Sequence, residues 1–525
     1  MDCLTVDDVV SLRAASEPVR VGIATYTSSD SFKSQHCNKK PHSKSMIHQL
    51  SIEASNFGGS ALKKTAKRHF KSRLIPLGIG RPIDEFYPWE SFTLEESFTL
   101  PQSSHAGATR VELNSSVNTI AKRDGLFNLS SGLNYCHSVG QQPLLRFITE
   151  HVEIIHNPPY RDWSVCLTCG STSAFEIVLR MFCNRGAAVF TEEYTYPGFI
   201  SSTLLLGLHT VGIRMDDDGL ITEELARTLR TWDDSKGSRP RFLYTIPSGQ
   251  NPTGATQSPE RKKAIYQIAE EYDLIIIEDD PYYFLRTKHS HQTVPNPDAI
   301  DSYISNLPPT FLSLDRSGRV VRLDSTSKIL APGLRAGWVT SSNEIIEKFI
   351  SYQEVGPLST SGPTQLMLWN LLDAKWGHRG FFTWLEHLSR QYRSRLDIVL
   401  ESCDKYLPKD VCQWSRPHNG MFLWIHIAVE KHPELRSQGE SVCDKSGVDF
   451  KTGEVEARVW SRACENGVQV TMGSLFEATK SCASRVSFRL TYAAADEIEL
   501  DEGVKRFANA VRKEFGLEQF GTGLS

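Results

Sequence analysis

One lysine of this chain follows a cluster of hydroxyl side chains at the end of an apolar run. In DSTSKILAPGLRAGW, residues 324–338, Lys328 comes just after Ser325 and Ser327, and Arg335 comes seven residues later. A lysine at a strand end in a closed site is desolvated, which lowers its pKa toward the neutral amine that forms a Schiff base with a carbonyl. The hydroxyls and the guanidinium would donate to a nearby phosphate. A single Lys–Arg pair is more often a solvated surface pair, so other features must decide between a surface pair and a ligand site.

Polar side chains follow three other predicted strands. Ser171 and Thr172 follow SVCLTCG at the start of a helix, where free backbone N–H groups make an anion site, although an ordinary helix cap is commoner. Asn251 follows RFLYTIPS in a Pro-Thr-Gly turn, which alone is only a turn signal. Asp279 ends the apolar run of DLIIIEDD, where a carboxylate either caps a loop or holds a cation, and Tyr282 could reach the same place.

These features belong together if the strands form one sheet. In open α/β sheets, ligands bind beyond the carboxyl ends of the strands. Together these features describe one ligand. Its aldehyde would react with the lysine, and its phosphate would fill the anion site. The carboxylate would face a cationic ring nitrogen, and the other donors would bind a phenolic oxygen. Pyridoxal 5′-phosphate has all four groups, so the sequence predicts a site for this cofactor.

The elements that must position these residues alternate between helical and strand periods from about residue 140. Strands alternating with helices predict an α/β fold with a mostly parallel sheet covered on both faces. A long helix from about Pro363 to Tyr406, followed by the strands NGMFLWIHI, GVQVTMG and SRVSFRLTY, predicts a smaller α+β domain. The predicted organisation is a flexible N-terminal extension (1–50), an N-terminal arm (51–130), a large cofactor-binding domain (131–365) and a small C-terminal domain (366–525) with an insertion near 432–454.

Composition is that of a cytosolic enzyme. The 525 residues carry a net charge of −4, which gives no electrostatic footprint for nucleic acid. No apolar run approaches the roughly 18 residues that a membrane span needs. The N-terminus resembles neither a secretory signal nor a transit peptide. Eleven scattered cysteines predict reduced thiols, and the pair Cys166 and Cys169 would point to opposite faces of a strand, so we expect no metal site.

Four motifs match one enzyme family in order and spacing. With YTIPSGQNPTG, IIEDDPYYFL, STSKILAPGLRAGW and NGMFLW, the chain resembles the class I, fold-type I pyridoxal phosphate-dependent aminotransferases over roughly residues 50–515. It is most similar to the aromatic amino acid and kynurenine/2-aminoadipate aminotransferase group, and its insertion at 432–454 resembles the fungal members. The resemblance implies a large domain with a seven-stranded sheet and a smaller domain.

The resemblance also implies roles around the cofactor ring. Lys328 would form the Schiff base and move the proton, and Asp279 would keep the pyridinium nitrogen protonated. Asn251 and Tyr282 would hydrogen-bond the phenolic oxygen, and Tyr196, in EEYTYPG, would stack on the ring.

Further matching positions would hold the phosphate and the substrate. Tyr135 would reach the phosphate of a neighbouring subunit, which implies a homodimer. Arg489, in SFRLTY, would clamp the substrate α-carboxylate, with Gly80, Phe422 and Asn251 also on the substrate side. The residues that match phosphate-binding positions are Ser171, Thr172, Ser325, Ser327 and Arg335.

The expected activity is transfer of the amino group of an aromatic amino acid, or of 2-aminoadipate, to 2-oxoglutarate by a ping-pong mechanism. A lyase or synthase on the same fold would share Lys328, Asp279 and Arg489, so the motifs leave that alternative open. A pyridoxal phosphate-sensing regulator would need a basic winged helix ahead of the fold, and residues 1–70 show no such pattern. A metal or redox protein has only the CxxC pair in its favour.

Overall fold

A computed structural model describes residues 4–16, 19, 21–22, 27–61, 77, 80–98, 116–288, 298–436, 450–479 and 486–520. The main sheet has seven strands in the order β3-β11-β10-β9-β8-β4-β5. This confirms the predicted α/β fold with a mostly parallel seven-stranded sheet. Contacts divide the chain into two units, Met1–Asn184 with Thr293–Glu386 and Arg185–Gln292 with His387–Ser525. The domain boundaries expected near residues 50, 130 and 365 stay a prediction.

The first unit contributes three buried strands. β3 (Trp163–Thr168), β10 (Val320–Ser325) and β11 (Gly337–Ser342) are buried at every position, and β11 is antiparallel to both neighbours. Three helices pack on β3: α5 (Gln142–Ile155), α6 (Ser171–Phe182) and α12 (Asn343–Gln353). In α5 the apolar residues recur at helical spacing, but residues 147–154 are all buried, so other segments cover the helix on its polar side as well.

The second unit contributes four parallel strands. They are β4 (Ala188–Glu192), β5 (His209–Ile213), β8 (Phe242–Thr245) and β9 (Ile275–Asp279). β4, β8 and β9 are buried at every position, as expected for parallel strands covered on both faces. The connecting helices are α7 (Pro197–Leu205), α8 (Thr222–Arg230) and α9 (Pro259–Glu271).

A second, antiparallel sheet lies in the same unit. Its order is β12-β13-β15-β14, and β13 pairs Trp424 with Arg489 of β15. This confirms the expected smaller α+β part. The bounds are β12 (Cys412–Trp414), β13 (Phe422–Ile427), β14 (Thr471–Met472), β15 (Val486–Thr491), α16 (Phe450–Glu465) and α17 (Glu497–Glu514).

The long helix predicted from Pro363 to Tyr406 is interrupted. α13 (Gly362–Trp369) is followed by a π-helical stretch at Asn370–Trp376, and α14 begins at Gly377 and ends at Tyr406. Gly377 has φ of 60°, a conformation that glycine adopts without steric cost. The apolar periodicity continues through the interruption, which is why the sequence pattern alone indicates one helix.

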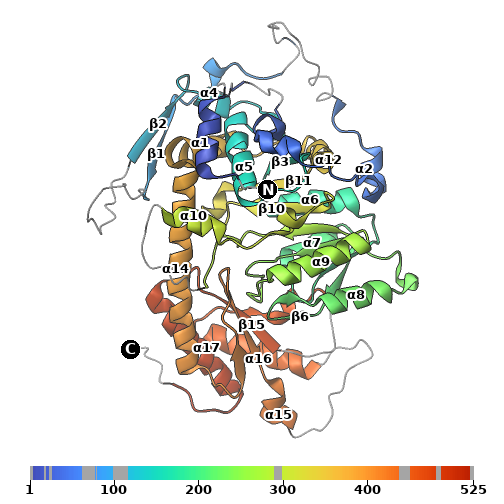
Figure 1. The fold of residues 1–525 in the computed structure, drawn as a ribbon. Coiled ribbons are helices and arrows are strands. Elements are labelled where there is room, and N and C mark those ends of the chain that lie inside the picture. The colour runs from blue at the N-terminus through green and yellow to red at the C-terminus, as the bar shows by residue number, and fades with distance from the viewer. Residues whose placement is uncertain are drawn as a thin grey trace. The chain divides into compact units, whose positions relative to one another are not determined.

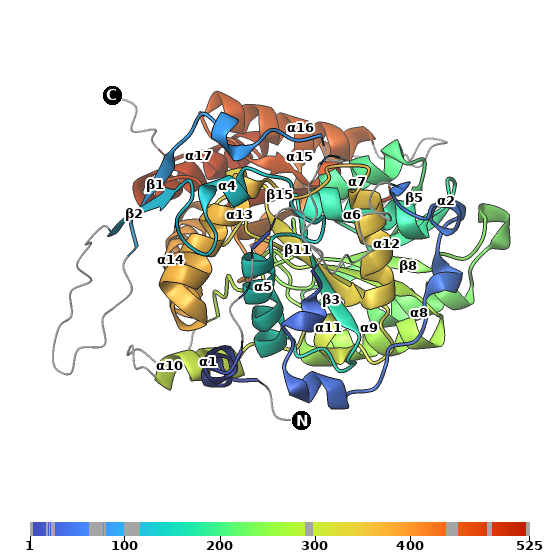
Figure 2. The same cartoon turned by 90° about the horizontal axis from the view of Figure 1, so that it is seen from above.

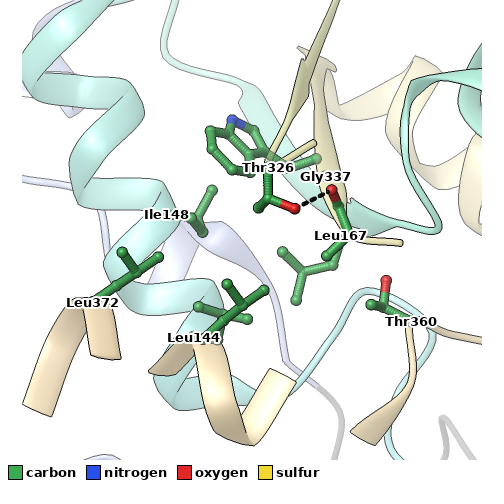
Figure 3. A pocket seen from close by; sticks show the side chains of 10 residues that line it. Leu144, Ile148, Leu167, Thr326, Gly337, Thr360 and Leu372 are labelled. Carbon is green, nitrogen blue, oxygen red and sulfur yellow. Dashed lines mark hydrogen bonds between the residues drawn. The ribbon is translucent and has the colours of Figure 1, made fainter. Parts of the chain in front are cut away.

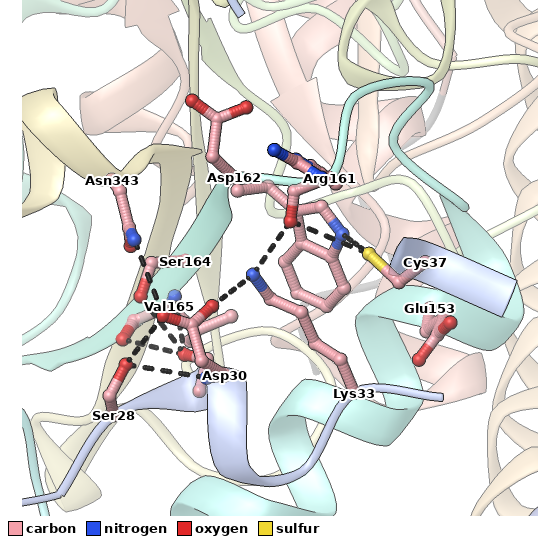
Figure 4. A network of polar contacts seen from close by, with 12 residues as sticks. Ser28, Asp30, Lys33, Cys37, Glu153, Arg161, Asp162, Ser164, Val165 and Asn343 are labelled. Atoms are coloured by element: carbon pink, nitrogen blue, oxygen red, sulfur yellow. Dashed lines mark hydrogen bonds and ion pairs between the residues drawn. The ribbon is translucent and has the colours of Figure 1, made fainter. Parts of the chain in front are cut away.

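The N-terminal segment packs on the first unit. α1 (Val6–Ala14) lies beside α5 (Figures 1 and 2) and is attached by an ion pair between Arg13 and Glu150. Residues 27–45, expected to be a flexible lead-in, instead make specific contacts (Figure 4). The Ser29 hydroxyl accepts the Val165 N–H at 2.8 Å, so an edge of β3 is satisfied by a polar side chain. The polar side chains of this segment therefore make hydrogen bonds to the first unit, which polar composition alone does not reveal.

The remaining elements are short. The middle of the insertion predicted near 432–454 lies outside the described residues. Within the described ranges, no helix combines the length and apolarity that a bilayer span requires.

The other bounds are α2 (Ile52–Asn56), β1 (Ser91–Glu96), β2 (Ser116–Ala121), α4 (Leu129–Gly132), β6 (Met215–Asp216), β7 (Gly219–Leu220), α10 (Asp298–Ser305), α11 (Phe311–Leu314) and α15 (Pro433–Arg436).

Candidate active site

The lysine loop of the first unit is a closed turn at the end of β10. The Ser325 hydroxyl donates to the Ser327 hydroxyl at 3.0 Å and accepts the Ser327 N–H at 3.2 Å. Thr326 ties the turn back to β11, because both its N–H and its hydroxyl donate to the Ala336 carbonyl. Lys328, half-buried, follows directly on this turn. Ser325, Ser327 and Lys328 thus lie on one hydrogen-bonded segment, and their role in binding a cofactor stays a prediction.

Arg335 lies beside the start of α6 in the same unit. Arg335 has φ of 47°, and its Nη2 donates to the Cys169 carbonyl at 3.2 Å. A Cβ at Gly170 would lie only 2.8 Å from this nitrogen, so glycine is required for the close approach. The Ser171 hydroxyl is buried and has no hydrogen-bond partner among the described residues, whereas Thr172 is exposed. A cation, an unpaired hydroxyl and a helix N-terminus together suit a phosphate.

The second unit places a buried carboxylate at the end of β9. Asp279 accepts a hydrogen bond from the Tyr244 hydroxyl of β8 at 2.6 Å. Burial, together with the neighbouring Asp279, raises the pKa of Tyr244 well above its ordinary value, so Tyr244 remains a neutral donor. Phe199 stacks on the Tyr244 ring with centroids 3.7 Å apart and holds its orientation. An ionised carboxylate fixed in this way can accept a proton-bearing ring nitrogen.

Tyr282, three residues after this carboxylate, is buried. Burial, together with the charge of Asp279, raises the pKa of Tyr282. The Tyr282 ring contacts the Phe422 ring edge-on at 5.6 Å.

Arg489 is held flat in the second unit. Its guanidinium lies 4.4 Å from the ring of Phe422 and 4.8 Å from that of Phe476, and its Nη1 donates to Asn251 Oδ1 at 2.8 Å. Burial lowers the pKa of Arg489, but an arginine stays charged at any physiological pH. Because the aromatic rings cover the planar group, its N–H edge is positioned to bind a carboxylate in two places.

Three other residues predicted for the site differ in how closely neighbouring atoms surround them. Tyr196 precedes α7, and a Cβ at Gly198 would lie 2.4 Å from its ring, so the glycine leaves room for the tyrosine. Tyr135 is 53% exposed. A Cβ at Gly80 would meet no described atom within 4 Å.

Sequence reasoning missed Tyr244 and Phe476. Tyr244 lies inside the apolar run of β8, where a buried aromatic residue is indistinguishable from core. Phe476 lies in a short turn at Gly473–Phe476 that has no strand or helix period. The available signal for Tyr244 was its position one residue before the end of a strand whose next loop carries Asn251.

Two other features of the first unit do not form ligand sites. Cys166 and Cys169 contact different carbonyl groups, those of Ser138 and Ser359, and in the described part of the chain no cluster of three His, Cys, Asp or Glu residues could hold a metal. A cavity of about 10 Å³ has an almost wholly apolar lining and has room for one water at most (Figure 3). Its lining residues are Leu144, Ile148, Leu167, Thr326, Ala336, Gly337, Trp338, Thr360, Leu368 and Leu372.

Comparison with known proteins agrees with this chemistry. The family model for aminotransferase class I and II matches residues 130–507. The chain is 44% identical over 480 residues to aminotransferase swnA of Arthroderma benhamiae, covering 90% of this chain and 92% of that one. It is 31% identical to the L-tyrosine:2-oxoglutarate aminotransferase atrD of Tapinella panuoides, covering 91% and 98%. The crystal structure of aminotransferase Aro8 from Candida albicans matches with a TM-score of 0.80 and 35% identity, covering 91% and 100%.

The residues present also fit the family's cofactor. The unpaired Ser171 hydroxyl and the Gly170–Arg335 contact suit its phosphate, and the buried Asp279 suits its ring nitrogen. The chain therefore belongs to the class I and II aminotransferases and is a pyridoxal phosphate-dependent transaminase.

Proposed function

We propose that this transaminase takes the amino group from an aromatic amino acid, or from 2-aminoadipate, and gives it to 2-oxoglutarate in two half-reactions. The contacts of Arg489 carry the proposal: its guanidinium lies against the rings of Phe422 and Phe476 and donates to Asn251. Both the donor and the acceptor have an α-carboxylate that such an edge can bind. The aromatic rings around Arg489 favour an aromatic substrate side chain. The named activity of the Tapinella panuoides relative supports the same pairing of substrates.

The second unit would orient the ring and the substrate. When bound, pyridoxal phosphate supplies an electron sink for the electron pair left on the substrate Cα. Asp279 would accept a hydrogen bond from the protonated ring nitrogen and would so keep that nitrogen positively charged. Asn251 and Tyr282 donate to the phenolic oxygen, and Tyr196 stacks on the ring. Arg489 fixes the carboxylate, so that the Cα–H bond can stand perpendicular to the ring.

The first unit would supply the phosphate contacts and the base. Lys328 would hold the cofactor through its amine, and the same amine, once free, would take up the proton from the substrate Cα. The closed turn Ser325–Ser327 limits the reach of the lysine, which favours transfer over a short path. The phosphate ligands proposed here are Ser171, Thr172, Ser325, Ser327 and Arg335.

We propose that the working enzyme is a cytosolic homodimer. Tyr135 is 53% exposed, as required of a side chain that binds the phosphate of a second subunit. The eight described cysteines are free thiols, which suits a reducing compartment. Size-exclusion chromatography with light scattering of wild type and Tyr135→Phe would test the assembly. The variant is expected to remain a dimer and to bind the cofactor more weakly.

The activity is tested by visible absorption of the purified enzyme. Tyrosine, phenylalanine or 2-aminoadipate should bleach the band of the lysine-bound cofactor, and 2-oxoglutarate should restore it. Lys328→Ala should show no such band, whereas Lys409→Ala, which changes a lysine paired on the surface with Asp404, should behave like wild type. Release of product without any oxo acid would instead identify a lyase, and a band that none of these donors bleaches would refute the proposed donors.

A further inference from the structure

One buried carboxyl group has no role in the function proposed above. Glu192 is the last residue of β4 and has no exposed surface. Its Oε1 accepts the Ile246 N–H at 3.0 Å and the hydroxyl of Thr245. Its Oε2 is also buried, and among the described residues it has no hydrogen-bond partner.

A carboxylate in this position would be an uncompensated buried charge. Burial raises the pKa of Glu192 to about 7, and what opposes burial is hydrogen bonding from Thr245 and Ile246 rather than a cation. The titratable group that feels its charge from the neighbouring strand β8 is the Tyr244 hydroxyl, which is itself neutral and bonded to Asp279. The neutral acid is therefore the form that the site accommodates below pH 7.

Glu192 lies at the base of the loop that carries Asn251. Thr245 ends β8, and its hydroxyl also accepts a hydrogen bond from Gln257 Nε2 at 2.9 Å. The Gln257 N–H donates to the Pro247 carbonyl at 2.9 Å, which closes the loop 246–257. Asn251, within this loop, accepts from Arg489 at 2.8 Å. Glu192, Thr245 and Gln257 thus hold the two ends of the segment on which the Arg489 contact depends.

We propose that Glu192 is a positioning residue that, as the neutral acid, fixes the base of loop 246–257 and through Asn251 the orientation of Arg489. Loss of its proton to solvent leaves a charge that the pocket does not compensate, so the loop loosens and substrate binding weakens. This inference rests on the proposed role of Arg489 as the carboxylate ligand. It assigns Glu192 no contact with substrate or cofactor.

Two variants test whether Glu192 acts as the neutral acid or as a carboxylate. Glu192→Gln keeps an oxygen that accepts from Ile246 and Thr245 and replaces the acid O–H by N–H. At pH 6 it should show kcat and KM within about twofold of wild type. Above pH 7 the KM of wild type should rise while that of the glutamine variant stays level. Glu192→Leu removes the acceptor and should raise KM at least tenfold at every pH, with a smaller change in kcat.

Infrared spectroscopy of the cofactor-free protein gives a readout independent of turnover. Wild type should show a C=O band of a protonated carboxylic acid that titrates near pH 7 and is missing in Glu192→Gln. Glu176 is a matched control, because burial raises its pKa too, but it lies on α6 in a partly exposed pair with Arg180. Glu176→Gln should leave the Glu192 band and the pH dependence of KM unchanged.

The outcomes are distinct. If the glutamine variant is as impaired as the leucine variant at pH 6, or if wild type shows no protonated band below pH 7, Glu192 acts as a carboxylate and the inference is wrong. If both kinetic profiles match wild type, Glu192 does not position the loop. Failure of every aromatic donor would refute the proposed function, while the infrared titration would still decide the protonation state of Glu192.

Discussion

The attachment of the N-terminal helix gives a quantitative prediction, tested by replacing Glu150 with glutamine. Glu150 lies on α5 with a side chain only 7% exposed. Arg13 of α1 donates from Nε to both of its oxygens at 3.0 Å, Arg146 donates at 3.0 Å, and His378 Nε2 lies 3.1 Å away. Glutamine has nearly the same shape but no charge, so the variant removes the ionic interactions with little change in packing.

The magnitude follows from the pKa of Glu150. Burial acts to raise this pKa, but hydrogen bonds from His378 and Arg13 overcome it and hold the pKa at about 2, against an ordinary value of 4.5. Each pKa unit corresponds to about 1.4 kcal/mol, so ionised Glu150 stabilises the folded chain by roughly 3 kcal/mol. The folded pKa is depressed, so this stabilisation is complete above pH 4.5 and is lost as the pH falls through about 2.

The assay is urea denaturation of the cofactor-free protein between pH 7 and pH 3. The glutamine variant should be less stable than wild type by about 3 kcal/mol at pH 7, and the difference should shrink to about half or less at pH 3. Glu176→Gln is the control, because Glu176 lies on α6 in a partly exposed pair with Arg180 at 3.8 Å. It should change stability by about 0.5 kcal/mol or less. A difference that is equally large at pH 7 and pH 3 would refute the electrostatic explanation.

Three further substitutions have defined outcomes. Arg489→Lys removes two-point carboxylate binding and should lower kcat/KM by about 30-fold or more for donor and acceptor alike, measured in steady state; an effect on one substrate only would contradict the shared role. Tyr244→Phe deletes the 2.6 Å hydrogen bond to Asp279, worth roughly 1.5–3 kcal/mol, and should weaken cofactor binding at least about tenfold in an equilibrium titration. Arg322→Met leaves the buried Asp324 without its partner at 2.9 Å and should destabilise the fold by about 3–5 kcal/mol, whereas the double change with Asp324→Leu should recover most of that loss in thermal unfolding.

The local sequence was sufficient for the sheet and for the candidate residues that follow its strands. The apolar run Leu274–Ile277, which covers the first three residues of β9, is the pattern expected of a strand buried on both faces. The loops after these strands also carry recognisable residue types. Glycine permits tight turns, and hydroxyl groups cap nearby backbone N–H groups, so both can be recognised from a few neighbouring residues. For that reason Lys328, Asp279 and Asn251 could be selected before any fold was known.

Partnerships between distant residues became visible only in the tertiary structure. Arg489 and Asn251 are 238 positions apart, and Tyr244 and Asp279 are 35 apart, so no local pattern joins them. The protonation of Glu192 likewise depends on how completely other segments exclude water from it. Local propensity and periodicity act over a few residues, whereas burial, hydrogen-bond partners and pKa arise from segments that meet only when the chain has folded.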